Sequence, residues 1–324
     1  MNSLEVNKLL ARTINVGLDL GEQGADKWCI RPDDITWKNI RDANFTAVRL
    51  CITWVDHCEK QTPFTIDPSV FTQVDAAVKG AVKHGLAVVV SNFLDPELMK
   101  DPVKWKARFL SISRQVAEHY ETAPESVVIE LLAEPREKMD AVWNDYLAAG
   151  LAEIRTSNPT RTIVIGPASY NNARKLSQLQ LPEDDRNIIV TIHHYWPLKF
   201  TIQGETFYYE EWAKMPLPMK LFLGNPRKWP GTTWKGTPRQ KAILKSMFDK
   251  AESWAKAHDR PLFVGEFGTS NTADMTSRVR WAHYITTLCR ERSMSWGYWS
   301  YGPAFALYDA TKKQWHTELL DALK

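Results

Sequence analysis

Two glutamates, Glu134 and Glu266, are the residues of this sequence whose type and position best fit a chemical role. Each stands at the C-terminal end of an apolar, strand-like run, VVIELLAEP in residues 127–135 and PLFVGEFG in residues 261–268. A carboxylate that ends a buried parallel strand lies at the rim that holds active sites in α/β barrels. Two carboxylates on one rim could act across a single bond, one as acid and base and the other as nucleophile.

Three further polar side chains interrupt apolar strands. Arg49 lies in AVRLCI, where a buried cation requires a carboxylate partner, and His193 and Tyr195 share one face at the end of IVTIHHY. An arginine and a tyrosine hydroxyl beside a carboxylate would keep it ionised, as a nucleophile requires. Paired carboxylates in this setting are typical of retaining glycosidases, in which the two groups lie about 5–5.5 Å apart.

Strand and helix patterns alternate along the chain. Strands are expected at residues 14–18, 47–52, 87–92, 127–132, 162–165, 188–192, 262–266 and 295–299. Helices are expected at residues 33–43, 67–84, 103–119, 138–156, 238–258, 275–292 and 314–323, with caps such as Asp33, Asp67 and Thr237 and a poorly formed helix near 171–179. This alternation favours a closed (β/α)8 TIM barrel of the α/β class. No composition shift or linker divides the chain, so we expect one catalytic domain over residues 1–324.

The alternation is interrupted at residues 196–236, which show no clear periodicity but contain Trp196, further aromatic residues and several prolines. Loops of this length in a compact domain are usually functional or disordered, and the aromatic residues favour an ordered one. The segment follows the sixth strand, so it should lie at the active rim, where flat aromatic faces would suit a sugar ring. A loop packed around its own small core is the alternative.

Bulk properties exclude several function classes. The net charge is +3 and neither Lys nor Arg forms runs, so we expect no nucleic-acid partner. No apolar stretch approaches the roughly 20 residues that span a bilayer, so we expect no membrane partner. The four cysteines lack metal-ligand spacing, and no metal site is expected. The first residues lack the apolar core of a signal peptide, which indicates a cytoplasmic protein unless a signal was removed from a secreted or periplasmic one.

Taken in order, the motifs resemble those of glycoside hydrolase family 5, the cellulase-type barrels, over almost the whole chain. FTAVRL is similar to the strand-two arginine motif of that family, ELLAEP to its acid/base motif ELLNEP, HHYWPLKFTIQG to its H-x-Y and FTHQG segments, LFVGEFG to its nucleophile motif and WGYWSYGPAFALYD to its closing strand. The resemblance implies a retaining β-glycoside hydrolase, endoglucanase-like, with Glu134 as acid/base and Glu266 as nucleophile. That chemistry requires no cofactor, and its partner would be a polysaccharide or oligosaccharide.

The resemblance also implies which residues contact the sugar. The expected substrate-binding residues are Arg49, Asn92, His193, Tyr195, Trp196 and Trp299. Trp299 would form the floor of the −1 subsite, with barrel filling as the alternative role. We expect the protein to act as a monomer.

The chain departs from the family pattern around the sugar. Ala133 replaces the asparagine before the acid/base, which in the family hydrogen-bonds the sugar 2-hydroxyl; Ser91 and Asn92 replace paired histidines; Ile202 replaces the FTHQG histidine; and GLDLG in residues 17–21 replaces G-N-x-L-E. Three interpretations stay open. The enzyme acts on an unusual sugar or as a transglycosylase, Ala133 is an engineered substitution, or the protein is a weakened enzyme that binds carbohydrate. Retention of both glutamates with Arg49 and Tyr195 favours an active enzyme.

Overall fold

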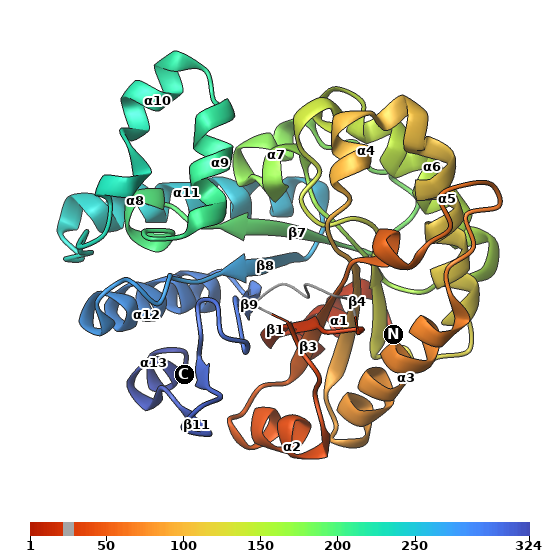
Figure 1. Ribbon diagram of the computed structural model, residues 1–324, viewed down its shortest axis with the longest axis horizontal. Helices are drawn as coiled ribbons and strands as arrows, with labels where there is room; N and C mark the ends of the chain where they lie inside the picture. Colours follow the sequence, from red (N-terminus) through yellow and green to blue (C-terminus); the bar gives the residue numbers. More distant parts are fainter. Residues whose placement is uncertain (22–28) are drawn as a thin grey trace.

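A closed barrel of parallel strands forms the centre of the molecule (Figure 1). The computed structural model describes residues 1–21 and 29–324. Within them the barrel strands are β1 (Arg12–Leu18), β3 (Ala47–Ile52), β4 (Ala87–Asn92), β5 (Val127–Glu130), β6 (Ile163–Ile165), β7 (Ile188–His194), β8 (Leu262–Phe267) and β9 (Ser295–Tyr298). β9 pairs with β1 and closes the ring, while the short β2 (Cys29–Ile30) pairs with the end of β1. The predicted (β/α)8 barrel is confirmed, with every expected strand in place.

The side chains inside the barrel change from apolar to polar along the strands. Near the strand starts the interior is filled by one apolar cluster that also includes residues of the N-terminal helix α1 (Ser3–Leu9) and its cap: Val6, Leu10, Ala47, Ala87, Val89, Val128, Val164, Ile189 and Phe263. Side chains two residues apart on a strand share a face. Arg49 therefore follows Ala47 on the inner face, and His193 follows Ile189 and Thr191. Because alternate residues of a strand face the barrel interior, these polar side chains lie inside the barrel near its C-terminal rim.

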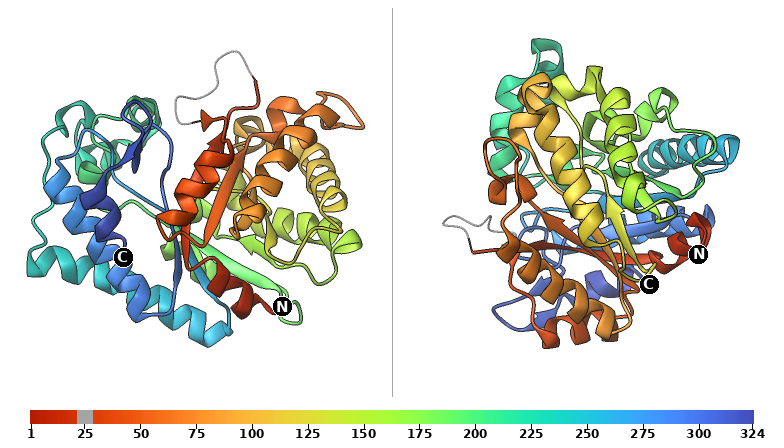
Figure 2. Two further views of the ribbon diagram at one scale, coloured as in Figure 1. Left: turned by 90° about the horizontal axis from the view of Figure 1, so that it is seen from below. Right: turned by 90° about the vertical axis from the view of Figure 1, so that its right-hand side faces the viewer.

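Helices surround the barrel (Figure 2). They are α2 (Asp34–Asp42), α3 (Pro68–Lys83), α4 (Pro96–Lys100), α5 (Pro102–His119), α6 (Trp143–Ser157), α7 (Ala168–Asn171), α11 (Pro238–His258), α12 (Met275–Glu291) and α13 (Thr317–Ala322), with 3-10 turns η1 (Trp54–His57), η2 (Glu137–Ala141) and η3 (Ala173–Gln178). The three predicted caps are confirmed, because Asp33, Asp67 and Thr237 each accept a backbone N–H of the following turn. Within the described residues, no helix has the length and apolarity needed to cross a membrane.

Two expected helices begin later than predicted, and α1, α4 and α7 were not predicted. The helix expected at 314–323 starts at Thr317, because β11 (Gln314–Trp315) pairs with β10 (Tyr308–Asp309) and Trp315 stacks on Phe45. The helix expected from residue 138 starts at Trp143, after a 3-10 turn. The weak pattern near 171–179 corresponds to η3. Helix α1 was missed although Asn2 and Glu5 form a capping box.

The segment 196–236 was predicted as a loop and instead contains short helices. These are α8 (Leu198–Thr201), α9 (Thr206–Lys214), α10 (Leu217–Leu223) and the 3-10 turn η4 (Pro226–Lys228). Prolines at 197, 216, 218 and 226 divide the segment into pieces too short for a periodic pattern to be visible. Tyr208 and Trp229 are buried in one cluster with the rim residues Phe93 and Trp299, and Trp234 packs into the main core. The segment therefore packs onto the barrel and not around a core of its own, which the alternative interpretation expected.

Candidate active site

Glu266 lies near the end of β8 with its carboxylate inside the barrel. Its Oε1 accepts a hydrogen bond from Arg49 Nη1 at 2.8 Å, and its Oε2 accepts one from the Tyr195 hydroxyl at 3.0 Å. Tyr195 directly follows β7, the strand that pairs with β8, whereas Arg49 lies on β3, which does not pair with β8. The carboxylate is therefore fixed by two donors from different elements, which sets the direction of its free lone pairs.

Arg49 is held by a buried network of its own. Its Nε donates to Glu130 Oε2 at 2.5 Å, and its Nη1 also donates to Asn15 Oδ1 at 2.8 Å. Asn15 in turn donates to the carbonyls of Gly265 and Tyr298 at 3.0 and 3.1 Å. The buried cation thus has two carboxylate partners, Glu130 and Glu266, as its place in a barrel strand required.

Glu134 stands four residues beyond the end of β5, in a backbone conformation that few residues adopt. Its φ is 51°, in the left-handed region. Its backbone N–H donates to Asn171 Oδ1 at 2.7 Å, and the next residue's carbonyl, that of Pro135, accepts from the Tyr170 N–H at 3.1 Å. Ser169, Tyr170 and Asn171 are themselves left-handed, with φ of 57°, 64° and 52°. A strained turn in the loop after β6 therefore holds the backbone that presents Glu134.

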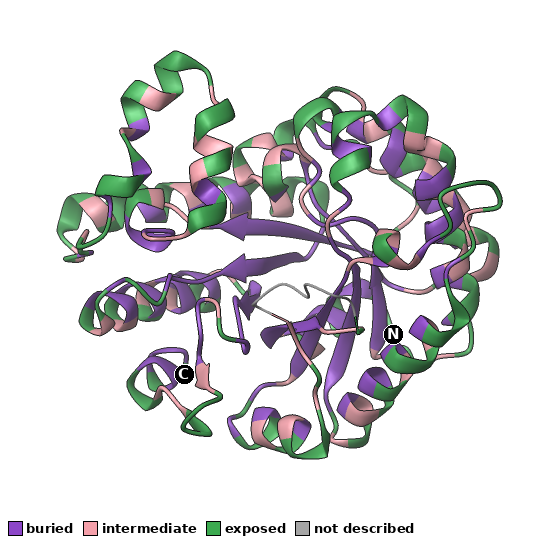
Figure 3. Ribbon diagram, viewed as in Figure 1, coloured by how far each residue is buried: buried purple, intermediate pink, exposed green. Residues whose placement is uncertain are grey.

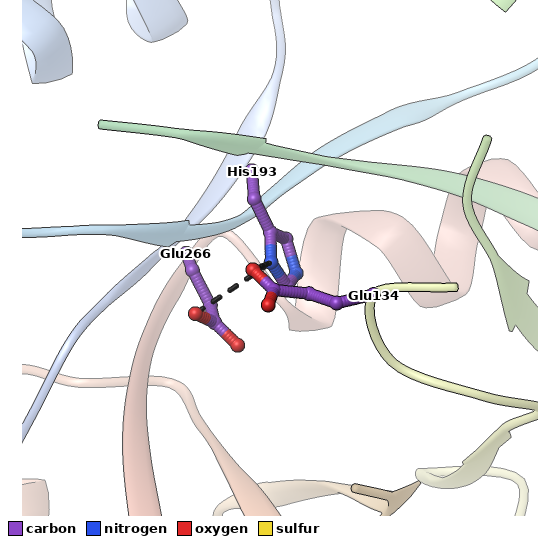
Figure 4. Close-up of side chains that lie close together, drawn as sticks. All are labelled: Glu134, His193 and Glu266. Carbon is purple, nitrogen blue, oxygen red and sulfur yellow. Dashed lines mark hydrogen bonds and ion pairs between the residues drawn. The ribbon is translucent and has the colours of Figure 1, made fainter. Parts of the chain in front are cut away.

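His193 connects the two glutamates (Figure 4). Its Nδ1 lies 2.8 Å from Glu134 Oε1 and 3.5 Å from Glu266 Oε2. One donor atom of each of the three residues falls within 4.8 Å of the other two. An oxygen of Glu134 and an oxygen of Glu266 thus lie within 4.8 Å of each other, which fits the close carboxyl pair of retaining glycosidases, about 5–5.5 Å, and not the about 6.5–9.5 Å of inverting ones.

Burial and neighbouring charges set the ionisation of this trio. Burial raises the pKa of Glu266, and the nearby His193 and Arg49 charges offset only part of that rise. Burial also acts against ionisation of Glu134, but its hydrogen bond to His193 holds the pKa of Glu134 below its ordinary value. Burial would lower the pKa of His193, but Glu266 and Glu134 raise it. Burial and Glu266 raise the pKa of Tyr195, so its hydroxyl stays a donor. The expected ionising effect of Arg49 and Tyr195 on Glu266 is present but is outweighed by burial.

The remaining predicted sugar contacts lie at different places on the rim. Trp299 follows β9 and is nearly buried, stacked on Phe93 with ring centroids 5.5 Å apart. Asn92 ends β4, and its amide donates to the Leu131 carbonyl at 3.3 Å, so it braces the loop that carries Glu134. Trp196 is half-buried and stacks on Phe222, with ring centroids 6.3 Å apart. The structure thus brings Arg49, His193 and Tyr195 onto the two glutamates, and places Trp196 outside that group.

The surroundings of Ala133 are apolar. Ala133 is fully buried, and its N–H donates to the Asn92 carbonyl at 2.9 Å. It belongs to one cluster with Cys51, Phe93, Ile202 and Trp299. Ala133 and Ile202, two of the positions that depart from the family motifs beside the sugar, therefore lie in one compact apolar floor.

Among the described residues, Glu134, His193 and Glu266 lie close enough together to be considered as metal ligands. The distance between His193 and Glu134, however, fits a hydrogen bond better than two bonds to one metal ion. His193 Nδ1 and Glu134 Oε1 are 2.8 Å apart. Two donors on a tetrahedral zinc ion with bonds of about 2.0–2.1 Å would stand about 3.3 Å apart. A hydrogen bond accounts for the contact directly.

Three residues of the site were missed by sequence reasoning. Asn15 and Glu130 carried the same signal as Arg49, a polar side chain in an apolar barrel strand, and could have been found by it. Asn171 carried no signal, because it follows β6 in a segment whose pattern is weak. Only the fold brings it to Glu134.

Comparison with known proteins agrees with this geometry. A family model described as cellulase (glycosyl hydrolase family 5) matches residues 19–305. Cel5A of Thermotoga maritima, solved in complex with cellobiose and with mannotriose, is 34% identical with a TM-score of 0.90, and the match covers 100% of both chains. The cellulose synthase subunit Z of Clostridioides difficile is 32% identical with a TM-score of 0.87, over 96% of this chain and 98% of that one.

A curated relative is considerably longer than this chain. Endoglucanase H of Acetivibrio thermocellus is 26% identical over 330 residues, which cover 100% of this chain and 34% of the relative. The chain therefore spans about a third of that protein.

Proposed function

Because the chain belongs to glycosyl hydrolase family 5, we propose that it hydrolyses β-glycosidic bonds of a glucan or a related polysaccharide with retention of configuration. The observation that carries this proposal is the spacing of Glu134 and Glu266, whose nearest donor atoms lie within 4.8 Å. At that distance a water molecule does not fit beside a sugar ring for direct attack, but a carboxylate reaches the anomeric carbon itself.

In the first step Glu266 attacks the anomeric carbon while the proton shared by His193 and Glu134 passes through Glu134 to the glycosidic oxygen. The C–O bond to the leaving group breaks, and a glycosyl ester on Glu266 forms. Arg49 and Tyr195 hold the carboxylate so that one oxygen faces the sugar. In the second step Glu134 removes a proton from water, the water oxygen attacks the same carbon, and the ester bond breaks.

His193 supports the proton transfer in this mechanism. It contacts Glu134 at 2.8 Å and Glu266 at 3.5 Å, so its imidazole can hold one proton next to the acid/base and between the two carboxylates. This chemistry requires no metal or organic cofactor. Every group it uses comes from one chain, which supports action as a monomer.

The substrate we propose is a β-linked glucan, or a mannan-containing polymer of similar shape. Support comes from Cel5A of Thermotoga maritima, whose structures hold cellobiose and mannotriose. A second candidate, favoured by the apolar surroundings of Ala133, is an enzyme for a sugar altered at the ring or at C2, or a transglycosylase. A weakened enzyme that mainly binds carbohydrate would show the same apolar floor.

The test is the variant Glu266→Gln on cello- and manno-oligosaccharides. We expect turnover to fall by about a million-fold or to be undetectable, because loss of a nucleophile removes the covalent route. Binding measured by calorimetry should persist. Glu205→Gln, a half-buried glutamate in the segment after β7, is the matched control and should keep its activity. Hydrolysis that survives in Glu266→Gln would show that the nucleophile is assigned wrongly, and binding without any turnover in the wild type would favour the carbohydrate-binding protein.

A further inference from the structure

Exposed apolar side chains gather on one small part of the surface. Eleven large apolar side chains are exposed in the described residues, and five of them fall between residues 207 and 222. They are Phe207, Leu217, Met219, Leu221 and Phe222, which we call the apolar tip. Isolated exposed apolar residues are normal on proteins, but a contiguous group marks an interaction site.

The apolar tip belongs to helices α9 and α10, which project from the barrel (Figure 1). α10 is exposed over nearly its whole length (Figure 3), and Leu223 is its one buried residue. Leu221 is 75% exposed, Leu217 66% and Phe222 65%. A seven-residue helix is not stable by itself, so its position depends on the core formed with Tyr208 and Trp229, and the tip side chains contribute little to that core.

The segment that carries the tip is basic. The segment 196–236 contains Lys199, Lys214, Lys220, Arg227, Lys228 and Lys235 against three glutamates, so it carries a net charge equal to that of the whole chain. Lys220 lies over the Trp212 ring at 5.5 Å, and Arg227 over the Tyr209 ring at 4.8 Å. Both charged groups therefore lie over aromatic rings of α9, and Lys220 Nζ also donates to the Ala213 carbonyl at 2.7 Å.

The shape and the side chains of the apolar tip indicate which class of partner it can bind. A projecting helix pair is convex, whereas small ligands require a concave pocket. Leucine and methionine lack the flat faces that sugar rings pack on, so a polysaccharide is a poor partner for this tip. Exposed aliphatic and aromatic side chains on a segment of net positive charge match the boundary between lipid chains and anionic headgroups.

We propose that the apolar tip attaches the protein to an anionic lipid surface. The expectation of no membrane partner rested on the lack of a spanning segment, and that criterion does not detect peripheral attachment. The occupant is the lipid interface, into which Leu217, Leu221 and Phe222 insert while exposed basic residues of the same segment, such as Arg227 and Lys228, contact headgroups.

The tip lies on the same rim as the active site. Phe222 stacks on Trp196, and the adjacent Tyr195 contacts Glu266 at 3.0 Å. From the other side, the Tyr170 hydroxyl donates to Glu211 of α9 at 3.1 Å. Attachment through the tip would therefore turn the catalytic rim toward the lipid surface. The active site would then face glycan that is anchored or secreted at that surface.

The test is sedimentation of the full chain with vesicles of phosphatidylcholine containing about one-third phosphatidylglycerol, at low ionic strength. We expect binding to these vesicles, weaker binding to pure phosphatidylcholine, and a marked loss of binding on raising the salt to roughly 1 M. Leu217→Ser/Leu221→Ser should lower the partition coefficient at least roughly tenfold, because each exposed leucine loses its transfer into lipid.

The matched control is Ile35→Ser/Val103→Ser, which removes two equally exposed apolar side chains from α2 and α5. The control should bind vesicles like the wild type, and both double variants should keep their turnover of a soluble aryl β-glycoside. Equal binding by both double variants, or no binding by the wild type, would overturn the proposal. A wild type that is dimeric in sedimentation velocity and becomes monomeric with the tip substitutions would instead assign the tip to contact between copies. None of these results depends on the identity of the nucleophile.

Discussion

At the scale of single residues, this site keeps both catalytic carboxylates, Glu134 and Glu266, but has an apolar floor beside them where the family motifs have polar side chains. Ala133 is fully buried in an apolar cluster, directly before the acid/base. A side chain that hydrogen-bonds the sugar 2-hydroxyl supplies transition-state stabilisation of several kcal/mol in glycosidases. Alanine has no group to supply it.

We therefore expect Ala133→Asn to raise kcat on aryl β-glucosides by about tenfold, since each 1.4 kcal/mol is about a factor of ten. The larger side chain should also cost about 1–3 kcal/mol of unfolding free energy, because the position is closely packed. Steady-state kinetics and urea unfolding measure both. A folded variant with lower kcat on glucosides would show that the floor is adapted to a different sugar.

The pKa directions predict the pH profile of kcat/KM. Glu266 must be ionised to attack, and its pKa is raised by burial, so the acidic limb should lie above the ordinary glutamate value of about 4.3. Activity is lost as the pH falls through that limb. Glu134 and His193 share the proton that is needed for leaving-group departure, and the pKa of His193 is raised, so the basic limb should lie above about 6.5.

His193→Asn tests the basic limb. Without the imidazole, Glu134 alone carries the catalytic proton and loses it as the pH rises. We therefore expect the basic limb of the kcat/KM profile to move to lower pH. Asparagine keeps a polar side chain of similar reach, so the barrel should remain intact. An unchanged basic limb would mean that another group carries the proton.

At the scale of elements, the turn after β6 controls the acid/base. Asn171 is fully buried and accepts the Glu134 N–H at 2.7 Å, and its amide lies where a Cβ on residue 166 would meet it at 1.8 Å, so Gly166 is required there. The loop of Glu134 depends on this contact from another strand connection. Asn171 is thus a positioning residue for the proton donor.

Asn171→Ala should impair the acid step more than the nucleophilic step. We expect kcat/KM on β-glycosides with poor leaving groups to fall roughly a hundredfold or more, because general acid catalysis supplies about 10²–10⁴. Glycosides with a dinitrophenyl leaving group, which depart without a proton, should lose much less. Asn172→Ala, which removes the neighbouring amide that accepts the Arg174 N–H, is the control. An equal loss on both substrate types would mean that Asn171 has only a structural role.

The elements show what the sequence could and could not predict. The barrel strands were found because runs such as Val88, Val89 and Val90 are apolar on both faces, and the helix starts because Asp33, Asp67 and Thr237 cap them locally. The short helices of 196–236 were not predicted, because they are held by tertiary contacts with the barrel and its rim and not by a pattern of their own. Asn171 could not be found for a related reason, since its role exists only once β5 and β6 are adjacent.

At the scale of the whole molecule, α1 completes the barrel at the end opposite the site. Val6 and its cap residue Leu10 share one cluster with the strand residues Val128 and Ile189. Leu10→Ala should lower the unfolding free energy by about 2–5 kcal/mol through cavity formation, with activity per folded molecule unchanged. Leu4→Ala, on the exposed face of the same helix, should cost less than about 1 kcal/mol. Urea unfolding distinguishes the two, and equal effects would contradict the role given to α1.

The central claim is that the spacing of Glu134 and Glu266 produces retention through a glycosyl ester on Glu266. Proton NMR of a cello-oligosaccharide digest, recorded before the product anomers equilibrate, tests it most directly. The account predicts that the β-anomer of the new reducing end appears first and the α-anomer only later, by mutarotation. An α-anomer formed first would contradict the account, because it requires direct attack by water and a wider pair of carboxylates.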